Sequence, residues 1–97
     1  MVTELKDLIK KFIERSPKIA KPLQEYRAIE LWDSVVDKRI SRHAKPLRIK
    51  NGILTVITSS SVWAQELRYV KEEILKKLNE KAGKDVVRDI RFQAGSL

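Results

Sequence analysis

Three consecutive serines, Ser59 to Ser61, stand directly before a tryptophan and a helical pattern, and serine hydroxyls can act as nucleophiles. A serine nucleophile needs a neighbouring base, and His43 is the one histidine in the sequence. No G-x-S-x-G elbow surrounds the serines, and no glycine accompanies them to build a phosphate cradle at the helix N-terminus. We therefore expect one serine to cap the helix, and His43 to be a helix-end cation or hydrogen-bonding group.

A second candidate is the segment KRISRHAKPLRIK, residues 38–50, which contains no carboxylate. Its cations are Lys38, Arg39, Arg42, Lys45, Arg48 and Lys50. The whole sequence has 21 basic and 13 acidic residues, a formal net charge of +8. A cationic cluster of this kind neutralises phosphates, so the segment predicts nucleic-acid binding without base reading. A merely solvated surface is the alternative.

Composition argues against most catalytic classes. Cysteine is absent and histidine occurs once, which excludes disulfides, thiolate catalysis and a histidine-rich metal cage. A small nuclease would need clustered carboxylates for two metals, whereas the acids here are scattered along predicted helix faces. We expect a non-enzymatic protein without cofactor or metal. No apolar run approaches the roughly 20 residues of a membrane helix, so a cytosolic protein is expected.

The chain of 97 residues fits a single domain, 1–97, with an N-terminal helix and connector over 1–22 and a core over 23–93. The first helix starts near Thr3 and is stopped by Pro17. Its apolar stripe is Leu5, Leu8, Ile9, Phe12 and Ile13. A second helix is predicted from Leu23 to about His43. Its core stripe is Trp32, Val35, Val36 and Ile40.

Asn51-Gly52 is the preferred two-residue type I′ hairpin turn, and alternating residues flank it. The turn predicts a register in which Lys50 pairs with Ile53 and Leu47 pairs with Val56. The predicted core face is Leu47, Ile49, Leu54 and Val56. The other face is partly basic and partly apolar: Arg48, Lys50, Ile53, Thr55 and Ile57.

A third helix is predicted from about Ser60 to Lys81, with Gly83 as its stop and a final strand over residues 86–93. Its core stripe is Trp63, Leu67, Val70, Ile74 and Leu78. Trp63 is expected to pack between helix and sheet with one edge near the surface, where a partner could contact it. The order helix, helix, strand, strand, helix, strand predicts an α+β domain: a three-stranded sheet with helices on one face.

Several of these motifs together resemble the DciA-like family, a bacterial family long catalogued as a domain of unknown function. The resemblance runs from about Leu31 to Phe92. It is carried by WDSVV at residues 32–36, the spacing H-x-x-P from His43, NGILTV at residues 51–56, SSSVWAQEL at residues 59–67, and IRF at residues 90–92. Asp37 stands where the family often has glycine, so an altered helix end is expected there.

The resemblance implies a KH-like domain and a DNA-binding adaptor that loads or operates the bacterial replicative, DnaB-type helicase on single-stranded DNA. It implies the replicative helicase and single-stranded DNA as partners, and leaves binding of double-stranded DNA and of RNA open. A membrane partner is not expected, and the expected location is cytoplasmic and nucleoid-associated. A tentative helicase surface is Trp63, Gln65 and Arg68. The glycines form no G-x-x-G loop, which RNA-binding KH modules use to clamp nucleotides. A KH-like RNA-binding module, ribosome-associated or not, is the alternative function.

Overall fold

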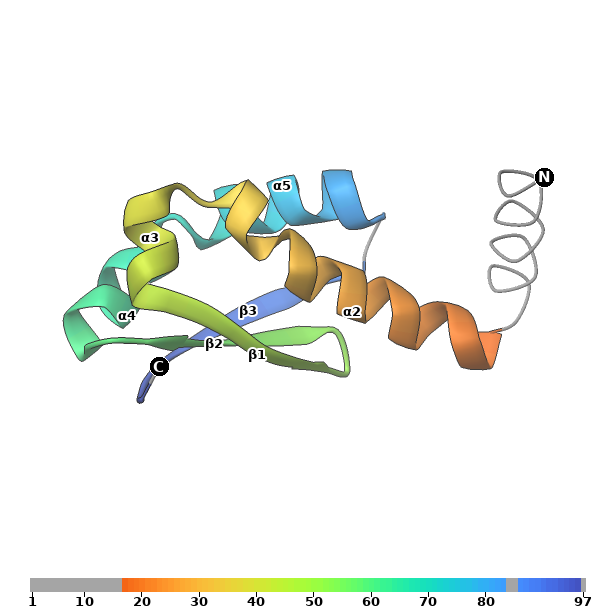
Figure 1. Ribbon diagram of the computed structural model, residues 1–97, viewed down its shortest axis with the longest axis horizontal. Helices are drawn as coiled ribbons and strands as arrows, with labels where there is room; N and C mark the ends of the chain where they lie inside the picture. Colours follow the sequence, from red (N-terminus) through yellow and green to blue (C-terminus); the bar gives the residue numbers. More distant parts are fainter. Residues whose placement is uncertain (1–16, 84–85, 97) are drawn as a thin grey trace.

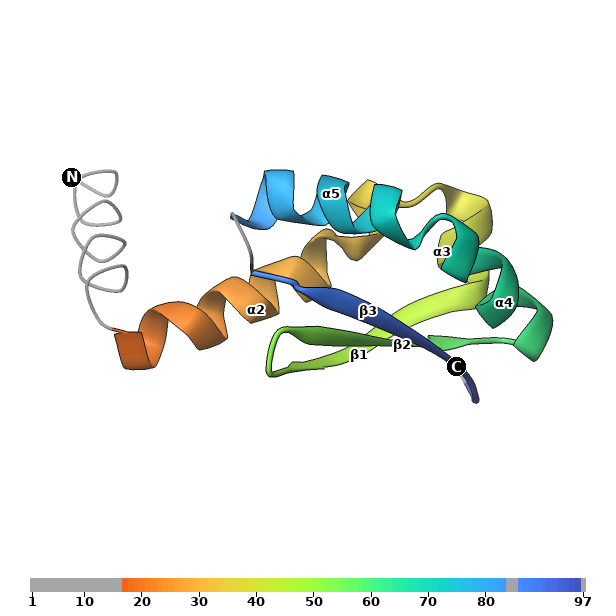
Figure 2. The ribbon, with the colours of Figure 1, turned by 180° about the vertical axis from the view of Figure 1, so that it is seen from behind.

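The computed structural model describes residues 17–83 and 86–96, and the predicted helix over residues 3–16 lies outside them. The elements in chain order are α2 (Pro17–Val35), α3 (Lys38–His43), β1 (Ala44–Lys50), β2 (Ile53–Thr58), α4 (Ser61–Tyr69), α5 (Lys71–Ala82) and β3 (Asp89–Ala94). Helices α2, α3 and α5 form a layer over one face of the sheet, and α4 lies beside the end of β2 (Figures 1 and 2). The predicted α+β class is confirmed, whereas the likeness to a KH domain stays a prediction.

The predicted connector over residues 18–22 is wrong, because α2 begins at Pro17. Proline suits the first helical position, since its φ is already helical and an N–H there would have no partner within the helix. The predicted single helix to His43 is also divided. Asp37 is extended, and its carboxylate accepts the Ile40 amide at 2.9 Å, which caps α3 as a separate helix. The altered helix end expected at Asp37 is therefore this cap.

The sheet has the order β1-β2-β3, with β1 antiparallel and β3 parallel to the central strand β2. Asn51 and Gly52 both have positive φ, 54° and 78°, as a type I′ turn requires. Lys50 pairs with Ile53, and the register continues as predicted to Arg48 opposite Thr55. The hairpin turn is held against the start of β3, because the Arg88 amide and guanidinium donate to the Gly52 and Asn51 carbonyls, each at 2.7 Å.

The predicted pairing of Leu47 with Val56 is wrong, because Pro46 pairs with Val56 and the register shifts at Leu47. Leu47 is the extra residue of a β-bulge, and 57% of its surface is exposed. Proline has no amide hydrogen for the ladder, so within sheets it is confined to edge strands and bulges, and β1 is an edge strand. Leu54 and Val56 are fully buried as predicted, and Ile49 packs against them from a half-buried position.

The predicted third helix is two helices, α4 and α5, with the break at Val70 (φ −108°, ψ 10°). The Val70 amide donates to the Leu67 carbonyl three residues back, at 3.1 Å, which tightens the end of α4. The break lets α4 pack on β2 and β3 while α5 packs on α2. Both halves keep the predicted stripe: Leu67, Ile74 and Leu78 are buried, and Trp63 and Val70 are half-buried.

The core joins the inner face of the sheet to α2, α4 and α5. Its largest fully buried side chains include Trp32, Phe92 and Leu54, and Ile90 is buried beside them, as predicted for the final strand. Gly83 ends α5 with φ 125°, as predicted, and β3 itself begins at Asp89. Helices thus cover one face of the sheet. Among residues 17–83 and 86–96 no helix covers the other face, and the side chains that alternate onto it define the open face.

The bulge predicts that two leucines of one hairpin respond very differently to truncation. Leu54→Ala should cost about 2–5 kcal/mol in the free energy of unfolding, because it leaves a cavity in the core. Leu47→Ala should stay within about 0.5 kcal/mol, as is usual for a surface position. Urea denaturation of both variants measures the difference. Equal large costs at the two positions would mean that β1 lacks the bulge and pairs in the simple register.

Candidate nucleic-acid interface

The bulge decides which side chains of β1 reach the open face. Opposite residues of an antiparallel pair lie on the same face, so Lys45 opposite Ile57, Arg48 opposite Thr55 and Lys50 opposite Ile53 all lie away from the core. In the simple register Lys45 would have faced inward, opposite buried Thr58. All three cations are exposed. Inserting Leu47 therefore aligns three of the six predicted phosphate-binding residues along one edge of the open face.

The rest of the open face is aliphatic in its centre and polar on β3. Ile53, Thr55 and Ile57 of β2 are half-buried there. On β3, Arg91 stands beside Thr55 and Gln93 beside Ile57, and both are exposed. The face thus has cations on one edge, an aliphatic centre and a further cation on the opposite edge. The predicted mixture of basic and apolar side chains on this face is confirmed.

Asp89 of β3 also lies on the open face, beside Ile53 of β2, and a helix-layer cation engages it. The Lys71 ammonium of α5 lies 3.0 Å from the Asp89 carboxylate. That hydrogen bond holds the pKa of the Asp89 carboxyl below its usual range, against the opposing effect of partial burial. Asp89 is therefore ionised at neutral pH and paired, so its charge is largely balanced by that of Lys71.

The other three predicted cations, Lys38, Arg39 and Arg42, lie on α3 in the helix layer, where all three are exposed. Helix α3 leads directly into β1, so the six residues lie on two consecutive elements (Figure 1). They do not all share the open face of the sheet. The basic segment is better described as two cation groups, one on α3 and one on the open face of β1.

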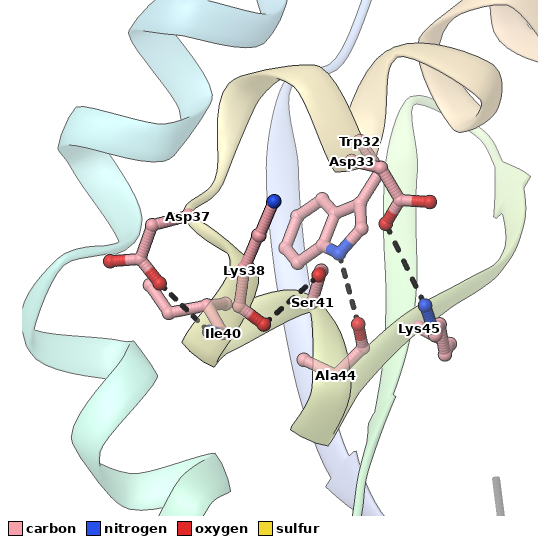
Figure 3. Close-up of polar contacts among 8 residues, drawn as sticks. All are labelled: Trp32, Asp33, Asp37, Lys38, Ile40, Ser41, Ala44 and Lys45. Atoms are coloured by element: carbon pink, nitrogen blue, oxygen red, sulfur yellow. Dashed lines mark hydrogen bonds and ion pairs between the residues drawn. The ribbon is translucent and has the colours of Figure 1, made fainter.

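The junction of α3 and β1 is fixed by Trp32. Its indole Nε1 donates to the Ala44 carbonyl at 3.0 Å, and both residues are fully buried (Figure 3). The Lys45 ammonium turns toward the Asp33 carboxylate of α2, at 3.7 Å. Both of those side chains are more than half exposed, so the ion pair is worth only about 0–1 kcal/mol.

His43, the last residue of α3, contacts both the serine segment and Trp63. Its Nδ1 lies 2.8 Å from the Ser59 hydroxyl, and its ring stacks on the Trp63 indole with centroids 4.5 Å apart and planes 11° apart. The expectation of a helix-end hydrogen-bonding group is confirmed. The stack itself was not expected from the sequence, because Trp63 is 20 residues away along the chain. It joins the start of α4 to the end of α3.

Of the three consecutive serines, Ser60 is the one that caps α4, because its hydroxyl accepts a hydrogen bond from the Trp63 amide at 3.3 Å. Ser59 instead bonds His43, and Ser61 is the exposed first residue of α4. The tryptophan in the first turn is half-buried between His43 and the core. The expected cap is confirmed, and Trp63 packs against the core as expected, whereas its predicted place between helix and sheet stays a prediction.

Comparison with known proteins assigns the chain to a family. The family model described as "Dna[CI] antecedent, DciA" matches residues 4–92. The chain belongs to the DciA family. The resemblance to the DciA-like family is thereby confirmed. The family model matches residues 4–92, a longer range than the resemblance from about Leu31 to Phe92.

Curated relatives of this DciA domain carry the name UPF0232. The UPF0232 protein of Mycobacterium tuberculosis is 38% identical over 61 residues, which are 63% of this chain and 33% of the relative. That of Rhodococcus jostii is 36% identical over 77 residues, 79% of this chain and 39% of the relative. That of Mycolicibacterium smegmatis is 36% identical over 68 residues, 70% and 35% of the two chains. The matched part of the chain thus spans 33–39% of the length of these relatives.

The tentative partner residues of the DciA domain differ in their surroundings. The Arg68 guanidinium donates to the Phe92 carbonyl at 3.3 Å, which ties α4 to β3. Gln65 is exposed on α4, whereas Trp63 is half-buried under His43. Val62 and Tyr69 are 66% and 77% exposed, and they lie seven residues apart on one helix face with Gln65 between them. This exposed apolar pair was not predicted from the sequence, although the i, i+7 spacing of Val62 and Tyr69 is visible there.

Elsewhere the described residues offer a groove but no metal cluster. The groove, about 520 Å³, lies at the two helix breaks, with Val36 and Ile40 on one side and Val70 and Ile74 on the other. None of the six predicted cations lines it. Within residues 17–83 and 86–96, no three carboxylate or imidazole side chains gather as metal ligands. Over the same ranges, no helix is both long and apolar enough to cross a bilayer.

The cap at Ser60 predicts a stability effect specific to one of the three serines. Ser60→Ala should lower the free energy of unfolding by about 0.5–2 kcal/mol, because the Trp63 amide loses its partner. Ser61→Ala is the matched control and should stay within about 0.5 kcal/mol. Thermal denaturation followed by circular dichroism compares the two. If Ser61→Ala proved the costlier change, Ser60 would not be the residue that caps α4.

Proposed function

We propose that this DciA domain binds single-stranded nucleic acid through phosphate contacts and acts as a non-enzymatic adaptor that helps to load or operate the replicative, DnaB-type helicase on single-stranded DNA. The observation that carries the nucleic-acid part is the bulge in β1. It brings Lys45, Arg48 and Lys50 onto one exposed edge of an open sheet face. Nothing in the proposal requires base-specific hydrogen bonds.

Charge and surface character support this use of the open face. Residues 38–50 contain six cations without a carboxylate, and on β3 the cation Arg91 is exposed while Asp89 is paired to Lys71. A cationic edge attracts the phosphate backbone and releases its counterions, which gives affinity without sequence preference. The half-buried Ile53 and Ile57 beside it offer an aliphatic surface that a single strand, with its bases free to turn outward, can contact.

The helicase part of the proposal rests on family membership, since the family description, "Dna[CI] antecedent", points to replication. An adaptor also needs a second surface that stays free while nucleic acid is bound. We place it on the outer face of α4, where Gln65 lies between exposed Val62 and Tyr69. Trp63 and Arg68, the other two residues of the tentative surface, would support that face from within through the His43 stack and the Phe92 carbonyl.

The phosphate contacts predict a steep dependence of affinity on salt. Contact with about four to six phosphates gives a slope of log K against log salt of roughly −3 to −4 on single strands, at about −0.7 per phosphate. The double variant Arg48→Gln, Lys50→Gln should flatten this slope by about 1–1.5 and weaken all sequences alike. Fluorescence anisotropy of labelled oligonucleotides over a salt series measures both quantities.

The matched control removes the same charge from the helix layer. Lys76→Gln with Lys81→Gln, both exposed on α5, should leave the slope within about half a unit of the original. If the two double variants weaken binding equally, the affinity reflects the net charge of the domain, and the open face is not a specific nucleic-acid-binding site. Running DNA and RNA strands of one sequence in parallel separates the DNA adaptor from an RNA-binding module, which would prefer RNA.

A further inference from the structure

We propose that Leu47 contacts a nucleobase, so that the bulge makes the open face select single-stranded over duplex nucleic acid. In this arrangement Lys45 and Arg48, on either side of the bulge in β1, hold phosphates while the leucine side chain packs against a base turned out from the strand. The inference rests on the proposed function and assigns to the same site the class of nucleic acid that it prefers.

The position of Leu47 is unusual for an exposed leucine. Single exposed leucines are common on protein surfaces and need no explanation by themselves. This one is 57% exposed, has no cross-strand partner, and stands in the sequence KPLRIK between cations. Bulges recur near functional sites because they redirect a side chain, and here the same insertion both exposes Leu47 and turns Lys45 outward.

The chemistry of the ligand then determines what Leu47 can contact. Phosphates are charged and well hydrated, so an aliphatic side chain gains little beside them, whereas a base has an apolar face. In a regular duplex those faces are stacked on one another, and exposing one costs a few kcal/mol of unstacking. A flexible single strand exposes them more readily. Ile57 opposite Lys45 and Ile53 opposite Lys50 add an aliphatic surface on β2 beside these cations.

The test compares three variants of the whole chain on a labelled mixed-sequence single strand and a duplex of equal length. Leu47→Ala should weaken single-strand binding on the order of fivefold, the low end for one base contact, and leave duplex binding within about twofold. Its salt slope should not change, because no phosphate contact is lost. Leu47→Phe should restore or exceed the original single-strand affinity, since an aromatic ring stacks on bases. Leu23→Ala, at a leucine of α2 that is 43% exposed against 57% for Leu47, is the control and should change neither affinity.

Two results would overturn the inference. If Leu47→Ala lowers single-strand and duplex affinities alike, the leucine does not discriminate between them. If Leu47→Ala is silent while Arg48→Gln, Lys50→Gln still flattens the salt slope, the phosphate site stands and the base contact is refuted. Silence of both the leucine and the cation variants would refute the proposed function as well. Circular dichroism melting of each variant confirms that the domain remains folded.

Discussion

The bulge at Leu47 is the constraint on which the arrangement of the open face depends. The side-chain period of a strand is two, so one inserted residue reverses every side chain on the far side of the insertion. Pro46 then faces the core opposite Val56, while the strand position of Lys45 moves to the face of Arg48 and Lys50, from which its ammonium reaches Asp33 of α2. Pro46 stands next to this bulge on an edge strand, and these are the positions at which a sheet accepts proline, which has no amide hydrogen for the ladder. Fold and candidate site thus depend on a single register shift.

Around that shift, the elements are fixed by a few polar contacts to the backbone. Trp32 donates to the Ala44 carbonyl and holds the start of β1 against α2. The Asn79 amide group both donates to and accepts from the Val87 backbone, at 2.8 and 2.9 Å, which fixes the approach to β3 after α5. Arg88 then ties that approach to the hairpin turn. Each contact satisfies a backbone group at the start of a strand or in a segment that connects two elements, where an unpaired group would be costly if buried.

Local patterns predicted the elements well and their ends less well. The turn at Asn51-Gly52, the stripe from Trp63 to Leu78 and the alternation around Ile90 all follow from spacing, because burial on one face imposes a period. The helix breaks at Asp37 and Val70 did not follow. A stripe of apolar residues continues across a bend whenever the two halves pack on different neighbours, as α4 and α5 do. Pro17 shows the reverse case, since residues 18–22 after it were predicted to be a connector, whereas α2 begins at Pro17 and continues through them.

The candidate site divides in the same way. The six cations were identifiable from composition, but their separation into a group on α3 and a group on β1 required the structure. The bulge was the missing step, and Pro46 within a predicted strand was its available signal. The contact of His43 with Ser59 and Trp63 joins residues far apart in sequence, and no local pattern predicts such a contact. Family membership, in contrast, was predictable from short sequence motifs, which can be recognised without knowing the structure.

The most direct test of the central claim is an NMR titration of the ¹⁵N-labelled chain with an unlabelled single-stranded oligonucleotide. Binding at the open face should concentrate amide shift changes in β1 from Lys45 to Lys50, across β2 at Ile53 to Ile57 and at Arg91 on β3, with a second group on α3. The outer face of α5, around Lys76, should remain unchanged. Shift changes confined to α2 and α5, with β1 silent, would contradict the open face as the nucleic-acid site.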